Sequence, residues 1–270
     1  MTDGCIERTD WTATGLIVLA IFALVACSWG LDNGPPLGDH EAIVAQCARQ
    51  IRQSGRWLIP RFNDVPFIRK PPLQPWLVAV SSYIVDPAGL SPPVSPVAAR
   101  FPSALAGVVT VLVVFGLARS MFSGRTALVA GGITACCGGT LFFSHNAQAE
   151  MVLTLFTTVA MTCFYRGIVD VSSRRKYLVG FYVCLSLAML AKAPLPLAIV
   201  GLPLFAYWFV TLPLADAINR DEGAGGLVSV FMAGMLNQLI RLRELWLLPG
   251  VVLFLVPFHI EGFRVLGRCL

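Results

Sequence analysis

Long uncharged runs separated by short charged segments make up most of this chain of 270 residues. Each long run is a candidate transmembrane helix, because about 20 consecutive apolar residues cross the hydrocarbon core of a bilayer. The first run covers residues 11–31. The pattern predicts six or seven transmembrane helices. The later ones are expected at residues 101–118, 126–143, 151–168, 177–191 and 194–214, with the beginning of one more at 245–259.

A long polar and basic segment, residues 32–70, follows the first run. Within it, residues 40–54 have apolar side chains at three- and four-residue spacing, namely Ile43, Val44, Cys47, Ala48 and Ile51. This spacing predicts an amphipathic helix that lies on the membrane with its apolar side down. Residues 71–85 are uncharged but short, which predicts an interfacial or re-entrant helix. Residues 215–244 are expected to form a loop with a surface helix.

The composition agrees with a membrane location. Hydrophobic residues make up 56% of the chain, charged residues 13%, and the mean hydropathy is +0.74, whereas a typical soluble domain has about 25% charged residues. These values argue against a soluble enzyme, a disordered chain or a nucleic-acid-binding domain. The expected fold class is an all-α membrane protein, with one membrane domain over residues 1–270 and an external loop with juxtamembrane helices at 32–86.

The first run is expected to be a retained helix. The residues before it are mostly acidic, with Asp3, Glu7 and Asp10 against Arg8, whereas a signal peptide begins with a basic segment. Removal of the run as a signal is the alternative. The eight cysteines include no C-x-x-C pair, so we expect small packed side chains rather than a redox or zinc site.

The positions of Lys and Arg predict the orientation. With a cytoplasmic N-terminus, ten of them fall at inner loop ends, and Arg174-Arg175-Lys176 is the strongest local signal. The first loop is then external although it carries six basic residues: Arg49, Arg52, Arg56, Arg61, Arg69 and Lys70. This excess predicts an anionic partner at the outer surface of the plasma (inner) membrane. The alternative is an inverted topology, which places the basic triplet outside.

Aromatic and basic residues alternate in residues 57–63 and 67–73, as they do at a lipid headgroup boundary. Pro71 and Pro72 fix the chain direction directly after Lys70. Lys70 is therefore expected to project from a rigid turn. A snorkelling anchor is the alternative, but together with the basic excess the pattern favours a phosphate site.

Several segments, taken in order, resemble a known family. Residues 38–41, 48–50, 54–63, 69–73 and 76–77 read GDHE, ARQ, SGRWLIPRFN, RKPPL and WL, and residues 99–107, 122–125 and 190–194 read ARFPSALAG, FSGR and LAKAP. This ordered set, between about residues 12 and 213, is similar to integral-membrane glycosyltransferases of the GT-C superfamily. The nearest types are aminoarabinose transferases and protein mannosyltransferases, which use polyprenyl-phosphate sugar donors.

The resemblance implies a catalytic carboxylate in the first external loop. In the family this loop bears an Asp-Glu pair whose aspartate is catalytic. Its aspartate position falls here on His40, and its glutamate position falls on Glu41. We therefore expect Glu41 to be the base, with Asp39 as the second candidate. A helix-dipole role is the alternative for Glu41.

The resemblance also implies a phosphate site. Lys70 matches the lysine that binds the lipid phosphate, and Arg69, Arg61 and Arg100 are expected to add positive charge beside it. Arg69 stands where some relatives have an acid implicated in metal binding, so the resemblance supports no metal site, and no cofactor is expected.

For the acceptor, Glu150 falls where relatives often have aspartate. Glu150 and His40 are expected to support the acceptor.

The expected function is transfer of a sugar from an undecaprenyl-phosphate donor to a lipid or envelope acceptor at the outer face of the membrane. The alternatives are a non-enzymatic membrane protein, such as a transporter or flippase component for lipid-linked sugars, or an inactive truncated transferase. Relatives carry further helices beyond the position of Leu270, so the chain is expected to correspond to their N-terminal part.

Overall fold

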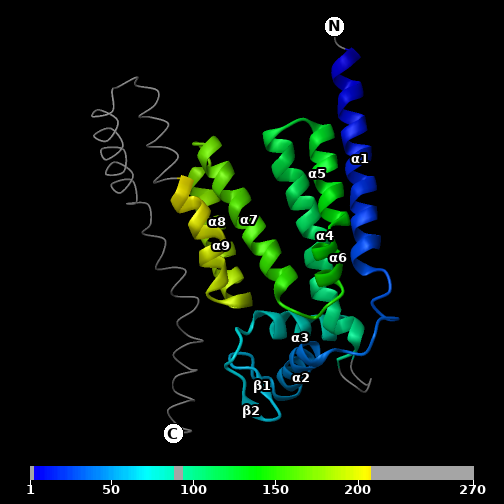
Figure 1. Ribbon diagram of the computed structural model, residues 1–270, viewed down its shortest axis with the longest axis vertical. Helices are drawn as coiled ribbons and strands as arrows, with labels where there is room; N and C mark the ends of the chain where they lie inside the picture. The colour runs from blue at the N-terminus through cyan, green and yellow to red at the C-terminus, as the bar shows by residue number, and fades with distance from the viewer. Residues whose placement is uncertain (1–2, 88–93, 208–270) are drawn as a thin grey trace, which may run out of the picture.

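The computed structural model describes residues 3–87 and 94–207 of the chain (Figure 1). Helices dominate these ranges, as predicted. They are α1 (Asp3–Ser28), α2 (Asp39–Ser54), α3 (Leu73–Val85), α4 (Pro96–Met121), α5 (Gly124–Cys136), α6 (Gly138–Ser144), α7 (Glu150–Val169), α8 (Arg174–Lys192) and α9 (Leu195–Ala206). A short antiparallel hairpin of β1 (Arg61–Phe62) and β2 (Val65–Pro66) lies between α2 and α3.

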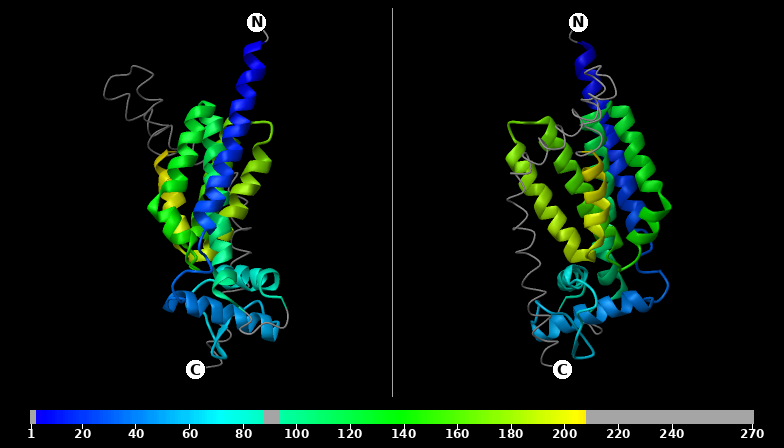
Figure 2. Two further views of the ribbon diagram at one scale, coloured as in Figure 1. Left: turned by 90° about the vertical axis from the view of Figure 1, so that its right-hand side faces the viewer. Right: turned by 60° about the vertical axis from the view of Figure 1, so that its left-hand side comes forward.

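The helices form two parts, a bundle and a layer across one of its ends. The bundle of α1 and α4 to α9 runs along the long axis of the molecule (Figure 1). Helices α2 and α3 and the hairpin lie below it in this view, and α2 crosses the direction of the bundle helices (Figure 2). The turn between α7 and α8 lies at the opposite end of the bundle.

Within the described residues, α4 and α7 are long and apolar enough to cross a membrane, and α5 with α6 make a third span if the bent pair counts as one. The run expected to be a single helix at residues 126–143 is in fact broken, and its two halves differ in direction by 55°. The break falls at Cys137, whose backbone is extended. Two glycines follow it, and glycine is a poor helix former, which explains the weakness at this point.

Four apolar clusters form the core, and the two that include α2 or α3 join the layer to the bundle. One joins α1, α4 and α5, one joins α3, α4, α7 and α8, and one joins α7, α8 and α9. The fourth joins α2, α3 and the start of α4. Helix α4 takes part in three of them, and Ser95 caps its N-terminus by accepting a hydrogen bond from the Ala98 N–H.

The apolar stripe of α2 was expected to face the membrane, and this expectation is wrong. Its side chains Val44, Ala48 and Ile51 are buried and pack in one cluster with Val78 and Ala79 of α3. The stripe is therefore covered by the apolar surfaces of α3 and of the start of α4 rather than by lipid. The helix itself was predicted correctly.

The hairpin was not predicted. Asn63 and Asp64 both adopt positive φ, at 50° and 63°, which is the conformation that a two-residue hairpin turn requires. Asn and Asp tolerate it better than most residues, so the pair was a usable signal. The predictions for residues 215–244 and 245–259, and for the end of 194–214, lie outside the described residues. The division into domains stays a prediction.

Candidate functional site

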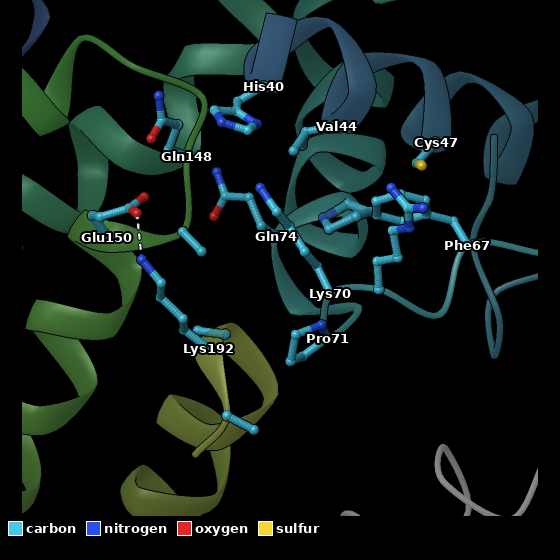
Figure 3. A pocket seen from close by; sticks show the side chains of 15 residues that line it. His40, Val44, Cys47, Phe67, Lys70, Pro71, Gln74, Gln148, Glu150 and Lys192 are labelled. Atoms are coloured by element: carbon cyan, nitrogen blue, oxygen red, sulfur yellow. Dashed lines mark hydrogen bonds and ion pairs between the residues drawn. The ribbon is translucent and has the colours of Figure 1, made fainter. Parts of the chain in front are cut away.

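A pocket of about 230 Å³ opens where the α2–α3 layer meets the ends of α7 and α8 (Figure 3). Its lining combines apolar side chains with a group of polar and charged ones. The latter are His40, Arg69, Lys70, Gln74, Gln148, Glu150 and Lys192. They come from four parts of the chain that are far apart in sequence, around residues 40, 69–74, 148–150 and 192, so only the tertiary structure brings them together.

Lys70 and Arg69 stand on a segment that is held at both ends. Before them, the Phe67 N–H donates to the Pro60 carbonyl at 2.8 Å and closes the hairpin. After them, the indole N–H of Trp76 donates to the Trp57 carbonyl at 2.5 Å, which ties α3 to the preceding loop. Both cations are exposed and line the pocket. The predicted rigid presentation of Lys70 therefore has a structural basis.

Glu150 and Lys192 form an ion pair on the opposite wall of the pocket. The Lys192 ammonium lies 2.7 Å from the Glu150 carboxylate, and both side chains keep contact with solvent (Figure 3). Glu150 begins α7 and Lys192 ends α8, which are the helix ends that favour a negative and a positive charge respectively. The pair thus presents one anion and one cation to whatever occupies the pocket.

Glu41 lies outside the lining of this pocket and is buried against Arg100. One carboxylate oxygen accepts hydrogen bonds from Arg100 Nε at 3.1 Å and from the Ala147 N–H at 2.8 Å. The other accepts from an Arg100 terminal nitrogen and from the Gly38 N–H, both at 3.1 Å. Burial raises the pKa of Glu41, but the hydrogen bonds from Arg100, Ala147 and Gly38 and the charge of Arg100 outweigh it, so this pKa lies below its usual value.

The predicted site residues thus fall into two groups. His40, Arg69, Lys70 and Glu150 line the same pocket. The others lie elsewhere. Arg100 is paired with Glu41, Arg61 donates to the Asp64 carbonyl, and Asp39 is an exposed residue at the start of α2. The roles assigned to all of these residues remain predictions.

Three of the polar and charged pocket residues were missing from the predicted site, namely Gln74, Gln148 and Lys192. Lys192 had a signal, because it is a charged residue inside an otherwise apolar hairpin, a position that commonly marks a functional group. Gln74 had a similar one, as the polar residue of the apolar stretch that begins α3. For Gln148 the sequence offers no comparable signal.

Cys47 also lines the pocket, but burial raises the pKa of its thiol to about 12. The thiol therefore stays protonated and packs as a small apolar group. Among the residues that the structure describes, no three His, Cys, Asp or Glu side chains gather closely enough to hold a metal ion. The expectations of no metal and no cofactor stay predictions.

Known proteins resemble this chain in sequence. An aminoarabinose transferase of Edwardsiella ictaluri, named undecaprenyl phosphate-alpha-4-amino-4-deoxy-L-arabinose arabinosyl transferase, is 31% identical over 149 residues, which are 55% of this chain and 25% of that protein. A protein of the same name, numbered 2, from Proteus mirabilis is 25% identical over 188 residues, 68% of this chain and 33% of that protein. The chain thus spans about a quarter to a third of these relatives.

Solved structures share the fold. ArnT from Cupriavidus metallidurans bound to undecaprenyl phosphate has a TM-score of 0.67 and 24% identity, over 86% of this chain and 42% of that one. The yeast protein O-mannosyltransferase Pmt1-Pmt2 complex bound to its sugar donor has a TM-score of 0.62 and 22% identity, over 94% and 34%.

The sequence pattern of the dolichyl-phosphate-mannose-protein mannosyltransferases matches residues 69–240, which include Arg69 and Lys70 and the Glu150–Lys192 pair of the pocket. This match covers more than half of the chain. The fold of the chain also agrees with the folds of the two solved structures above. The chain therefore belongs to the dolichyl-phosphate-mannose-protein mannosyltransferase family.

Proposed function

We propose that this protein transfers a sugar from a polyprenyl-phosphate donor, such as an undecaprenyl-phosphate sugar, to a lipid or envelope acceptor at the outer face of the membrane. The observation that carries the proposal is the pair of adjacent cations, Arg69 and Lys70, on the wall of a pocket at one end of an apolar helix bundle. This arrangement suits a ligand with an anionic head and a hydrocarbon tail. Family membership and the names of the relatives support the same substrate class.

The reaction needs few groups from the protein. A hydroxyl or amine of the acceptor attacks the anomeric carbon of the sugar, a bond forms there, and the bond between that carbon and the phosphate oxygen breaks. The electron pair leaves with the polyprenyl phosphate, and Lys70 and Arg69 stabilise the charge that develops on it. One base must take the proton of the attacking group.

For the base, we favour Glu150 over Glu41 and Asp39. Glu150 is the carboxylate among the described lining residues of the pocket, and its side chain is accessible. The Glu41 oxygens are engaged by Arg100 and two backbone N–H groups, so Glu41 would have to leave its ion pair before it could accept a proton. We propose that Glu41 positions α2 and that His40, which also lines the pocket, contacts the acceptor.

We further propose that α1, α8 and α9 cross the membrane together with α4, α7 and the bent pair α5–α6. In this topology the N-terminus is cytoplasmic and residues 32–86 form the external loop. Support comes from the charge at the two ends of the bundle: the Arg174-Arg175-Lys176 triplet begins α8 at the end opposite the α2–α3 layer. A basic cluster of this kind marks the cytoplasmic side.

A binding and turnover measurement on the purified full chain tests the proposal. Undecaprenyl phosphate should bind the wild type, and Lys70→Ala should weaken binding by about 10- to 100-fold, because a hydrogen bond between charged groups is worth about 1.5–3 kcal/mol. Lys176→Ala is the matched control, since Lys176 is exposed at the other end of the bundle, and it should bind like the wild type.

Turnover is then measured with undecaprenyl-phosphate 4-amino-4-deoxy-L-arabinose and other undecaprenyl-phosphate sugars. Glu150→Gln should retain donor binding and lose at least about tenfold in rate, whereas equal turnover of wild type and Glu150→Gln would exclude Glu150 as the base. Binding of the donor by the wild type without consumption of any sugar would overturn the transferase and favour a carrier of lipid-linked sugars.

A further inference from the structure

Gln74 places an unused hydrogen-bond acceptor at the pocket. The residue lies in the first turn of α3 and is only 2% exposed, yet it lines the pocket. Its carbonyl oxygen Oε1 is buried and has no hydrogen-bond partner. Figure 3 shows the Gln74 side chain beside Lys70, in the space between the α2–α3 layer and Glu150.

The orientation of the Gln74 amide is fixed by its neighbours. Ser103 donates its hydroxyl proton to the Gln148 carbonyl at 3.3 Å, and that carbonyl can only accept. The hydroxyl has no second proton, so the atom of Gln74 that lies 3.3 Å from the Ser103 oxygen must be the donor Nε2. Oε1 is therefore the end of the amide that is left without a partner.

An unpartnered buried carbonyl oxygen is unfavourable, and the great majority of buried polar atoms in native proteins have partners. The missing partner must carry an N–H or O–H group. A phosphate diester cannot supply it, because its oxygens only accept hydrogen bonds and would be repelled by Oε1. The ligand phosphate therefore faces Lys70 and Arg69, and a different part of the same ligand faces Gln74.

We infer that Gln74 is a specificity-determining residue whose Oε1 accepts a hydrogen bond from a hydroxyl or amino group of the sugar on the donor lipid. The inference rests on the proposed function, since it assumes that a lipid phosphate lies at Lys70. The sugar is attached directly to that phosphate, and Gln74 lies a few residues after Lys70 in sequence and beside it in the pocket. The acceptor substrate also carries a hydroxyl or amine, so the experiment must separate the two sources.

The test compares two lipids in the absence of acceptor, undecaprenyl phosphate and the same lipid carrying a sugar. Gln74→Met keeps the length of the side chain and removes the acceptor atom. The preference for the sugar-bearing lipid should fall about tenfold in this variant, while the affinity for undecaprenyl phosphate stays within about twofold of the wild type. Gln53→Met, on the exposed side of α2, is the matched control and should leave both affinities unchanged.

A second variant covers the case in which Gln74→Met does not fold. Ser103→Ala leaves Gln74 in place but removes the group that holds its amide, so it should lower the same preference by a smaller factor. An unchanged preference in every folded variant would overturn the inference, and so would an equal loss of affinity for both lipids, which indicates a packing role. A loss that appears only when acceptor is added would assign Gln74 to the acceptor and overturn the sugar contact. If the wild type binds neither lipid, the proposed function itself fails.

Discussion

Glu41 joins the α2–α3 layer to the bundle through its ion pair with Arg100. Both side chains are almost fully buried, with 5% and 3% of their surface exposed, and Arg100 also donates to the Pro35 carbonyl at 2.8 Å. Removing one member of a buried ion pair leaves the other as an unpaired charge, which is the costly outcome. The sequence predicted Glu41 as the base and Arg100 as part of the phosphate site, whereas in the structure the two side chains form an ion pair with each other.

Replacement of Glu41 by Gln is therefore expected to destabilise the protein. We expect a loss of about 3–5 kcal/mol in the free energy of unfolding, measured by denaturant unfolding in detergent, because Arg100 loses its counter-charge. Glu150→Gln is the matched control. Its ion pair with Lys192 is accessible to solvent, so the loss there should be at most about 1 kcal/mol. Equal stability of Glu41→Gln and the wild type would show that the ion pair does not hold the layer.

The pH dependence of stability gives a second test of the same residue. The pKa of Glu41 lies below its ordinary value of 4.5 in the folded protein, so its ionised form stabilises the fold. This contribution is complete above pH 4.5, the unfolded value, and is lost as the pH falls through the folded value. In Glu41→Gln the acid-side loss of stability should be smaller than in the wild type. A wild-type profile that stays flat below pH 4.5 would contradict the assignment.

Among the elements, α4 takes part in three of the four apolar clusters. Its glycines show how closely the neighbouring helices approach it. A Cβ added to Gly107 would lie 3.0 Å from the Cys27 sulfur of α1 and 3.2 Å from the Ser144 Cβ of α6. A Cβ on Gly116, in the same helix, would meet no atom within 4 Å. Gly107 is therefore required for the contact of α1, α4 and α6, whereas Gly116 is not.

The two glycines form a matched pair for a stability experiment. Gly107→Ala should lower the thermal unfolding temperature, because overpacking of a tight contact costs about 1–3 kcal/mol. Gly116→Ala should raise it slightly, because alanine is a better helix former than glycine by up to about 1 kcal/mol. The measurement is thermal unfolding of both purified variants. A Gly107→Ala variant as stable as Gly116→Ala would rule out close packing at this point.

Prediction of the elements from sequence succeeded where the apolar pattern was strong. It failed where the outcome depends on how elements pack against one another. The helices at α2, α3, α4, α7 and α8 follow directly from apolar runs and their polar ends. The break between α5 and α6 was missed, because residues 126–143 carry no charge and the glycines after Cys137 were not taken as a helix break. The covering of α2 by α3 could not be foreseen, since an amphipathic stripe fits a protein surface as well as a bilayer.

At the scale of the whole molecule, charge is distributed between the two ends of the bundle. The pocket and the α2–α3 layer lie at one end, and the turn before Arg174 lies at the other. Asp170 orders this turn by accepting hydrogen bonds from the Ser172 hydroxyl and from the Ser172 and Ser173 N–H groups. The hydrogen bond from the Ser172 side chain contributes most to holding the pKa of Asp170 below its usual value.

Protease sites inserted at the two ends test the proposed topology. A site between Asn63 and Asp64, in the exposed hairpin turn, should be cut by protease added to spheroplasts of the expressing host. A site at Ser172 should be protected until the membrane is opened. Cleavage at Ser172 with protection of the hairpin would reverse the orientation and place the pocket on the cytoplasmic side.

Local sequence patterns are sufficient to predict a helical membrane protein, the position of most of its helices, and a cationic turn at Lys70 in the same loop as an amphipathic helix. These features depend on local periodicity and on the chemistry of neighbouring residues. These patterns do not predict that Glu41 is buried against Arg100, or that Glu150, Lys192 and Gln74 reach one pocket, because these contacts arise from the tertiary structure. A buried polar side chain pairs with whichever distant segment packs against it, so its partner depends on how the helices pack rather than on the residues beside it.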